Sequence, residues 1–132
     1  MKCDLVLDTC VFLWLVTCPE VLTGNARRAI EDAALPALSA ISLVEIHRLL
    51  RAKKIRLPCT DKSLKRWYDR AHSHHGIVDA PVTSEVAHTA ERLPFHHKDP
   101  ADRFILATAR LNQCPLVSPD GLFSHYRQRV IW

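Results

Sequence analysis

The stretch HHKDPADRFILATARL, residues 96–111, places Asp99 and Asp102 at the start of an apolar helix. Asp99 is a suitable N-cap because Pro100 then takes the first helical position, and Asp102 falls in the first turn, where the helix dipole favours anions. Capping alone accounts for both acids and predicts nothing about function. The positions of the other acidic residues therefore decide whether these two have a further role.

Short apolar segments alternate with helical segments on both sides of this stretch. The segments with a strand pattern are residues 3–7, 37–41, 77–82, 115–118 and 129–132. The expected helices are residues 10–16, 24–33, 42–52, 60–71, 84–92 and the stretch after Asp99. Because short apolar strands that alternate with helices build parallel sheets covered on both faces, the sequence predicts an α/β fold.

Length and composition indicate one ordinary globular domain over residues 1–132, with 48% hydrophobic and 24% charged residues. No apolar run approaches the ~20 residues of a membrane span, and Asp4 and Asp8 interrupt the apolar N-terminus, so we expect no signal peptide and a cytoplasmic protein.

Five cysteines without a CxxC pair favour reduced thiols over disulfides or a zinc site. Three glycines exclude a dinucleotide fingerprint and a P-loop.

Positive charge is concentrated between Arg48 and Arg70, where nine Lys or Arg face only two Asp. The rest of the chain is slightly acidic although the whole carries a net charge of +4. A basic segment beside an acidic remainder favours a polyanionic partner, and Lys53, Lys54 and Arg56 are the candidates for contacts with it. A solvated helical hairpin explains the same charges, and both interpretations stay open.

The acidic residues fall where the strands of a parallel sheet end, which is where such sheets bind ligands. Asp8 closes the first strand, Glu45 lies in the first turn after the second strand, and Asp120 follows the fourth. Asp99 and Asp102 open the helix that leads into the fourth strand. The five carboxylates are therefore expected at one edge of the sheet.

Each acid also has a structural explanation of its own. Ser42 and Glu45 match a capping box, with Ile41 and Ile46 as the accompanying hydrophobic staple. The sequence SPDG around Asp120 is typical of a turn. These explanations account for single residues and leave the gathering of the acids unexplained.

Asp8 sits in the apolar stretch LVLDTCVFLWLV, where an unpaired carboxylate is costly. Several carboxylates at one edge repel one another and raise each other's pKa unless a cation neutralises them. Ligands that are all oxygen, with no His or Cys at a matching spacing, suit Mg²⁺ or Mn²⁺. The pattern therefore predicts a carboxylate-held divalent metal site.

Four stretches together resemble the PIN-domain ribonucleases of the VapC toxin type, in family order and across nearly the whole chain. They are LVLDTCVFLWLV (5–16), SAISLVEIHRL (39–49), HHKDPADRFILATA (96–109) and LVSPDGLF (116–123). The third is the most specific of them, while LVLDT or SLVEI alone would be a weak signal.

The resemblance implies a three-layer α/β/α domain with a short central parallel sheet and an Mg²⁺- or Mn²⁺-dependent endoribonuclease activity. Asp8 and Asp102 would be the principal metal ligands, with Glu45 and Asp120 completing the catalytic acids and Asp99 beside them. The resemblance also implies an RNA substrate, a cognate antitoxin protein and a homodimer, with no membrane partner.

The chain departs from the family pattern at two positions, since Cys10 follows Thr9 where His, Asn or Ser is more usual, and Val44 replaces a common Trp. Neither change removes a carboxylate. Thr9 and Ser118 are supporting candidates that could hold a ligand or a water through their hydroxyl groups, or simply end strands. Arg103 is expected either to touch a phosphate or to pair with a neighbouring acid.

The histidines and tryptophans favour plainer roles. The histidines of residues 72–75 are expected in a solvated loop, while His96 and His97 are expected to position the acidic motif or to approach RNA. Packing is the expected role of the three tryptophans, Trp14, Trp67 and Trp132.

Two other functions fit the same residues. One is a non-catalytic PIN-like module that binds RNA or a partner, and the other is an RNA-maturation nuclease that is not a toxin. The complete set of acids favours an enzyme over a binding module, and the short single domain favours a toxin.

Overall fold

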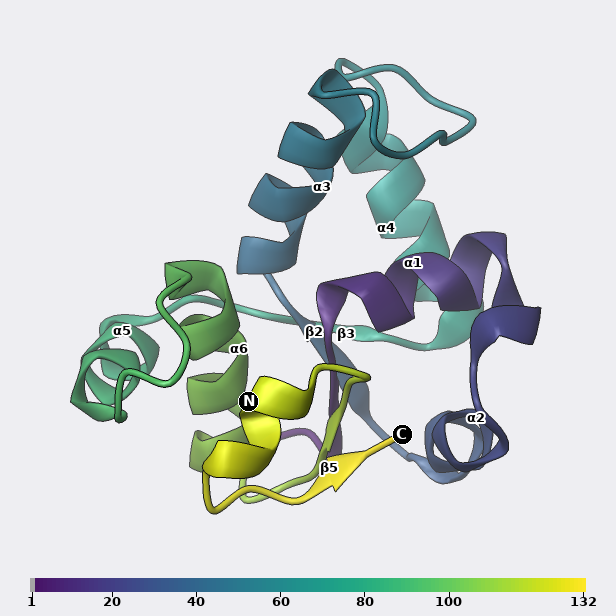
Figure 1. Ribbon diagram of the computed structural model, residues 1–132. Helices are drawn as coiled ribbons and strands as arrows, with labels where there is room; N and C mark the ends of the chain where they lie inside the picture. Colours follow the sequence, from purple (N-terminus) through teal and green to yellow (C-terminus); the bar gives the residue numbers. More distant parts are fainter. Residues whose placement is uncertain (1) are drawn as a thin grey trace.

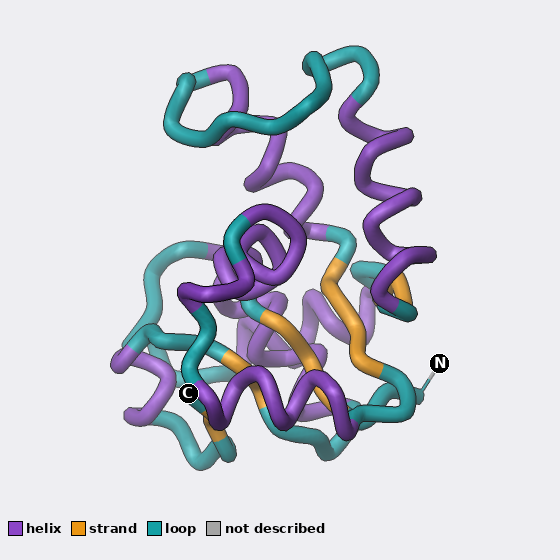
Figure 2. Tube along the Cα trace, turned by 90° about the vertical axis from the view of Figure 1, so that its right-hand side faces the viewer, coloured by secondary structure: helices purple, strands orange, loops and turns teal. Residues whose placement is uncertain are grey.

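The computed structural model describes residues 2–132 and contains a five-stranded, all-parallel sheet in the order β3-β2-β1-β4-β5 (Figures 1 and 2). The strands are β1 Leu5–Leu7, β2 Pro36–Ser39, β3 Val78–Ala80, β4 Leu116–Val117 and β5 Val130–Ile131. The helices are α1 Thr9–Thr17, α2 Gly24–Asp32, α3 Ile41–Arg51, α4 Leu64–His75, α5 Ser84–Arg92 and α6 Pro100–Leu111. Two short 3-10 turns, Pro19–Val21 and Gly121–His125, were not predicted. The predicted α/β fold is confirmed.

Alternation along β1 explains why helices cover both faces of the sheet. Leu5 and Leu7 pack into one hydrophobic cluster with residues of α1, α2 and α4, whereas Val6 packs into the other with α5 and α6. All three side chains are buried. A strand buried on both faces requires apolar residues at every position, which is the pattern that the sequence shows. The three-layer α/β/α arrangement follows from this.

The strand order reverses direction at β1. The chain runs outward from β1 to β2 and β3 on one side, then returns to place β4 and β5 on the other. Ligands of open parallel sheets bind at such a reversal, outside the carboxyl ends of the strands. The register pairs Leu7 with Val117, so the next residues, Asp8 and Ser118, emerge side by side.

The interpretation of residues 72–75 as a solvated loop is wrong. These residues form the last turn of α4, which ends at Gly76 in the left-handed conformation with φ of 64°. His72 is buried, its ring lies against Phe12 and Tyr68, and its Nδ1 is 2.8 Å from the Tyr68 carbonyl oxygen. A segment with three histidines has the composition of a polar loop. In a helix, however, side chains at different positions face different directions, and His72 faces the core.

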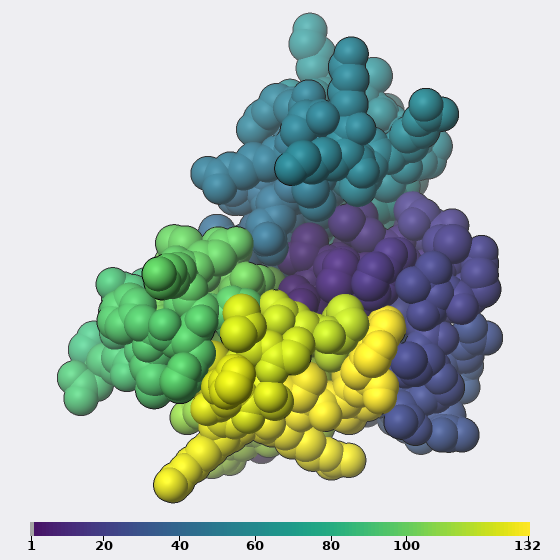
Figure 3. Space-filling view, viewed as in Figure 1, coloured from purple at the N-terminus to yellow at the C-terminus, as the bar shows by residue number. Residues whose placement is uncertain are grey.

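Helices α3 and α4 rise away from the sheet as a hairpin, which forms the upper lobe in Figures 1 and 3. We call residues 48–70, which cover the end of α3, the connecting loop and the start of α4, the basic arm. Lys53, Lys54 and Arg56 are exposed in its connecting loop. No helix among residues 2–132 is long and apolar enough to cross a membrane.

The cysteines and tryptophans behave as predicted. All five cysteines are free, and the buried pair Cys3 and Cys114 have their sulfur atoms 3.9 Å apart. Trp14 and Trp132 pack against each other with ring centroids 5.7 Å apart, and Trp67 meets Phe12 edge-on.

Candidate metal centre

Asp8 ends β1 and begins α1, and its carboxylate is almost fully buried at 7% exposure. Oδ1 accepts a 2.8 Å hydrogen bond from the Thr9 backbone N–H, so Asp8 is the N-cap of α1. Oδ2 accepts a 2.6 Å bond from the Ser118 hydroxyl at the end of β4. Burial raises the pKa of Asp8, although these two hydrogen bonds oppose the rise.

Glu45 does not form the predicted capping box with Ser42. Helix α3 begins at Ile41, its N-cap residue Ala40 has no side-chain cap, and Ser42 Oγ lies 2.8 Å from Thr9 Oγ1. Thr9 Oγ1 in turn donates a 2.5 Å bond to Glu45 Oε1. The Glu45 carboxylate is therefore held toward the end of β1 instead of folding back on its own helix.

The predicted hydrophobic staple is also wrong, because Ile41 packs against the cluster of α5 and α6 while Ile46 lies in the cluster on the other face. The N-cap is Ala40, two residues before Ser42, so Ile41 and Ile46 both lie within the helix and face different clusters. Burial is the main cause that raises the pKa of Glu45, and the negative charges of Asp8 and Asp99 add to it.

Asp99 and Asp102 open α6 as predicted. Asp99 is the N-cap, accepting a 3.0 Å bond from the Ala101 backbone N–H, and Pro100 is the first helical residue. The Asp102 side chain is 20% exposed. Burial first, and then the charges of Asp8, Asp99, Glu45 and Asp120, raise the pKa of Asp102 to about 7. The five acids thus act on one another electrostatically, as the sequence predicted.

Asp120 caps the short 3-10 turn Gly121–His125 through a 2.9 Å bond from the Leu122 backbone N–H. Its own backbone N–H donates to Ser118 Oγ at 3.0 Å. Because Ser118 also donates to Asp8, its hydroxyl links the two acids at the ends of β1 and β4. Ser118 and Thr9 therefore hold carboxylates in place, a geometry that agrees with a supporting role.

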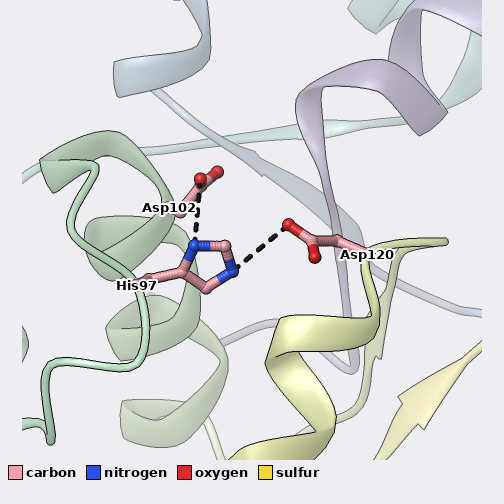
Figure 4. Close-up of side chains that lie close together, drawn as sticks. All are labelled: His97, Asp102 and Asp120. Atoms are coloured by element: carbon pink, nitrogen blue, oxygen red, sulfur yellow. Dashed lines mark ion pairs between the residues drawn. The ribbon is translucent and has the colours of Figure 1, made fainter.

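His97 is a neighbour of the acids that the sequence did not assign to the metal site. Its ring is 5% exposed, with Nδ1 3.4 Å from Asp102 Oδ2 and Nε2 3.2 Å from Asp120 Oδ2 (Figure 4). The ring rests on Phe123, and the His97 backbone N–H donates to Tyr126 Oη. The only signal in the sequence was the pair of histidines before the acidic motif, and the approach of Asp120 comes from the tertiary fold.

Arg103 does not face the acids of the cluster, and its ion pair is with Glu91, an acid outside the cluster. The residue is 2% exposed, and its guanidinium donates to the carbonyl oxygens of Ala90, Leu93, Pro94 and His97. The nearest carboxylate oxygen, on the exposed Glu91, is 3.9 Å from Nε. Arg103 therefore ties the α5–α6 connection, including His97, to helix α6.

Two groups of ligand atoms lie close enough to hold a cation, each within a 4.8 Å span. They are Glu45, Asp99 and Asp102, and His97, Asp102 and Asp120. The first group offers only carboxylate oxygens, the ligands that Mg²⁺ and Mn²⁺ accept. Glu45 and Asp102 are partly buried, and the negative charges around them add to burial in raising their pKa values. A divalent ion would relieve this repulsion, so the residues fit such an ion.

The basic arm does not join this cluster. Lys53, Lys54 and Arg56 remain on the exposed connection between α3 and α4. Arg56 lines a pocket of about 300 Å³ together with Cys10 and residues of α1, which begins at the site. None of the five acids lines this pocket, and the arm contributes no ligand to the cluster.

Comparison with known proteins agrees with this arrangement. The PIN domain model matches residues 5–128. Ribonuclease VapC22 of Mycobacterium tuberculosis is 36% identical over 128 residues, which cover 96% of this chain and 95% of that protein.

Solved structures share the fold at lower identity. A toxin–antitoxin complex from Klebsiella pneumoniae has a TM-score of 0.64 at 21% identity, covering 94% of this chain and 93% of the other. VapBC2 from Rickettsia felis, bound to a DNA fragment from its promoter, has a TM-score of 0.67 at 12% identity, covering 96% of each chain. The family model spans most of the chain and the sequence relative agrees with it, so the chain belongs to the PIN-domain family.

Proposed function

We propose that this protein is a metal-dependent endoribonuclease of the VapC type and the toxin of a toxin–antitoxin pair. The observation that carries the proposal is the meeting of five carboxylates from four separate segments at the end of β1 and β4. The alternative of a non-catalytic binding module is less well supported, because a binding role needs no set of mutually repelling, partly buried acids. The identity to a protein named ribonuclease VapC22 supports the same reaction.

The metal ligands in this proposal are Asp8, Glu45, Asp99, Asp102 and Asp120, holding Mg²⁺ or Mn²⁺. When bound, the ion activates a water for attack and stabilises the charge that develops on the phosphodiester. Thr9 and Ser118 fix the orientation of Glu45 and Asp8, since each hydroxyl donates to one of these carboxylates. Preorganised ligands of this kind avoid reorganisation when the RNA arrives.

The partners follow from the same comparison. The structural neighbours from Klebsiella pneumoniae and Rickettsia felis are toxin–antitoxin assemblies, which supports an antitoxin protein as the partner of this chain. We further propose that the protein forms a homodimer and acts on RNA in the cytoplasm. An RNA-maturation nuclease would use the same site and differs in its biology, so growth arrest on expression distinguishes the two.

A cleavage assay tests the reaction. Protein treated with EDTA is incubated with a labelled RNA, and Mg²⁺ or Mn²⁺ is then restored. We expect cleavage only with the ion, and none from Asp8→Asn. Asp69→Asn is the control, because Asp69 is an exposed acid paired with Lys65 on α4. Equal cleavage by the wild type with and without EDTA would overturn the proposed mechanism, and growth unaffected by expression would overturn the toxin assignment.

A further inference from the structure

The imidazole of His97 is a buried polar group that the proposed carboxylate site does not use. Its side chain is 6% exposed and points between Asp102 and Asp120 (Figure 4). Nε2 has no hydrogen-bond partner among residues 2–132, although Asp120 Oδ2 is 3.2 Å away. A buried nitrogen left without a partner costs free energy unless something else meets it.

The position of this nitrogen matches that of a metal ligand. Ligand atoms at right angles around an ion with bonds of 2.0–2.2 Å lie about 3 Å apart, and the separation of Nε2 and Asp120 Oδ2 is close to that value. The other ring nitrogen, Nδ1, faces Asp102 Oδ2 at 3.4 Å. Histidines that bind metals characteristically direct their second nitrogen toward a carboxylate, which fixes the ring.

Other contacts hold the ring in this pose without help from an ion. Phe123 packs against it, with centroids 4.5 Å apart, and the His97 backbone is fixed at both ends. The N–H donates to Tyr126 Oη, and the carbonyl oxygen accepts a 3.2 Å bond from Arg103. The nitrogen is therefore presented to the acids by the fold.

We propose that His97 Nε2 and Asp120 form a mixed nitrogen–oxygen cation site that prefers a first-row transition-metal ion over Mg²⁺, with Asp102 on Nδ1 orienting the ring. Asp102 also belongs to the carboxylate-only group with Glu45 and Asp99, so the two groups meet at this residue. Imidazole is a softer ligand than carboxylate and favours transition metals, whereas Mg²⁺ is held by oxygen ligands and water. Asp120, at 35% exposure, leaves the mixed site open to solvent on one side.

The inference rests on the proposed metal-dependent function, and pulsed EPR on the Mn²⁺-loaded protein tests it separately from activity. We expect ¹⁴N coupling to the bound Mn²⁺ in the wild type, replaced by ¹⁵N coupling when the histidines are isotopically labelled. Mn²⁺ that binds without nitrogen coupling would overturn the inference and leave the proposed function standing. Failure to bind any divalent ion would overturn both.

Two variants assign the nitrogen to its residue. His97→Gln should remove the coupling and weaken Mn²⁺ binding at least about tenfold while changing Mg²⁺ binding much less. His96→Gln is the matched control, because His96 is the exposed neighbour that packs on His125 and Tyr126. Coupling that survives in His97→Gln would contradict the assignment, and the labelled wild type decides the outcome if that variant does not fold.

Discussion

The acidic cluster and the basic arm carry opposite charges under opposite structural conditions. The acids come from four separate segments, and Asp8, Glu45 and Asp102 are sufficiently buried for their pKa values to rise. The cations of the arm lie in one continuous segment, and Lys53, Lys54 and Arg56 are exposed. Buried charge depends on tertiary position and costs stability, whereas exposed charge costs little stability and its interactions are screened by salt.

The largest expected effect comes from Asp102→Asn, because Asp102 belongs to both candidate ligand groups. Loss of this carboxylate should lower the rate of RNA cleavage by about a thousandfold or more. Single-turnover cleavage of a labelled RNA at saturating Mg²⁺ or Mn²⁺ measures the effect, with Asp69→Asn as the control. A reduction of less than tenfold would mean that Asp102 is only a first-turn acid of α6.

The next effect concerns the hydroxyl that positions an acid. Thr9→Val removes the donor to Glu45 and leaves Ser42 without its partner, so it should weaken metal binding about tenfold to a hundredfold. The lost buried hydrogen bonds should lower the free energy of unfolding by about 1–2 kcal/mol.

Thr17→Val is the matched control, because Thr17 lies on the same helix and bonds only the Leu13 carbonyl oxygen. Metal titrations and denaturant unfolding of the two variants separate positioning from stability. Equal metal affinity in Thr9→Val and the wild type would reduce Thr9 to a packing residue.

These contacts mark the limit of what the sequence predicts. The alternation of apolar strands with helices predicted the sheet, and the strand ends predicted which acids would meet, because both follow from local periodicity and the geometry of parallel sheets. The capping box failed because Ser42 and Glu45 have the right spacing for two different structures, and the approach of Thr9 from another segment selects one.

The same limit applies to His97 and Arg103. A histidine and an arginine beside an acidic motif predict surface contacts, but whether they turn inward depends on how the α5–α6 connection folds. In the structure, four carbonyl oxygens at the end of α5 and in this connection draw Arg103 inward. No spacing rule along the chain encodes that arrangement.

The stability of the metal-free protein should depend on pH because of the acidic cluster. Burial and the neighbouring acids raise the pKa of Asp102 to about 7 in the folded protein, from 3.8 for an unperturbed carboxyl group, so folding takes up a proton between these pH values. The metal-free protein should therefore lose about 1–3 kcal/mol of stability as the pH rises from 4.5 to 7.5. The raised pKa values of Asp8 and Glu45 act in the same direction.

Denaturant unfolding in EDTA across this pH range measures the change, and Asp102→Asn should reduce it. A metal-free wild type that becomes more stable toward pH 7.5 would contradict the description of the cluster as a set of repelling buried acids.

The smallest effect is expected in the basic arm. Replacing Lys53, Lys54 and Arg56 with Gln should leave stability unchanged and weaken RNA binding, lowering the slope of log affinity against log salt by about 0.7 for each lost contact. The exposed Arg27, Arg28 and Arg92, replaced together, provide a charge-matched control outside the arm. Salt titrations of RNA binding with catalytically inactive protein measure the slopes, and equal slopes in the two triple variants would make the arm an ordinary solvated surface.

Thermal unfolding with and without a divalent ion tests the central claim most directly, since that claim is that the buried carboxylates are stabilised by a bound cation. At pH 8, Mn²⁺ should raise the melting temperature of the wild type above its value in EDTA. Asp102→Asn in EDTA should already melt about 3–8 °C higher than the metal-free wild type and respond little to Mn²⁺. A wild type that is indifferent to Mn²⁺, or a variant that melts lower in EDTA, would contradict the account.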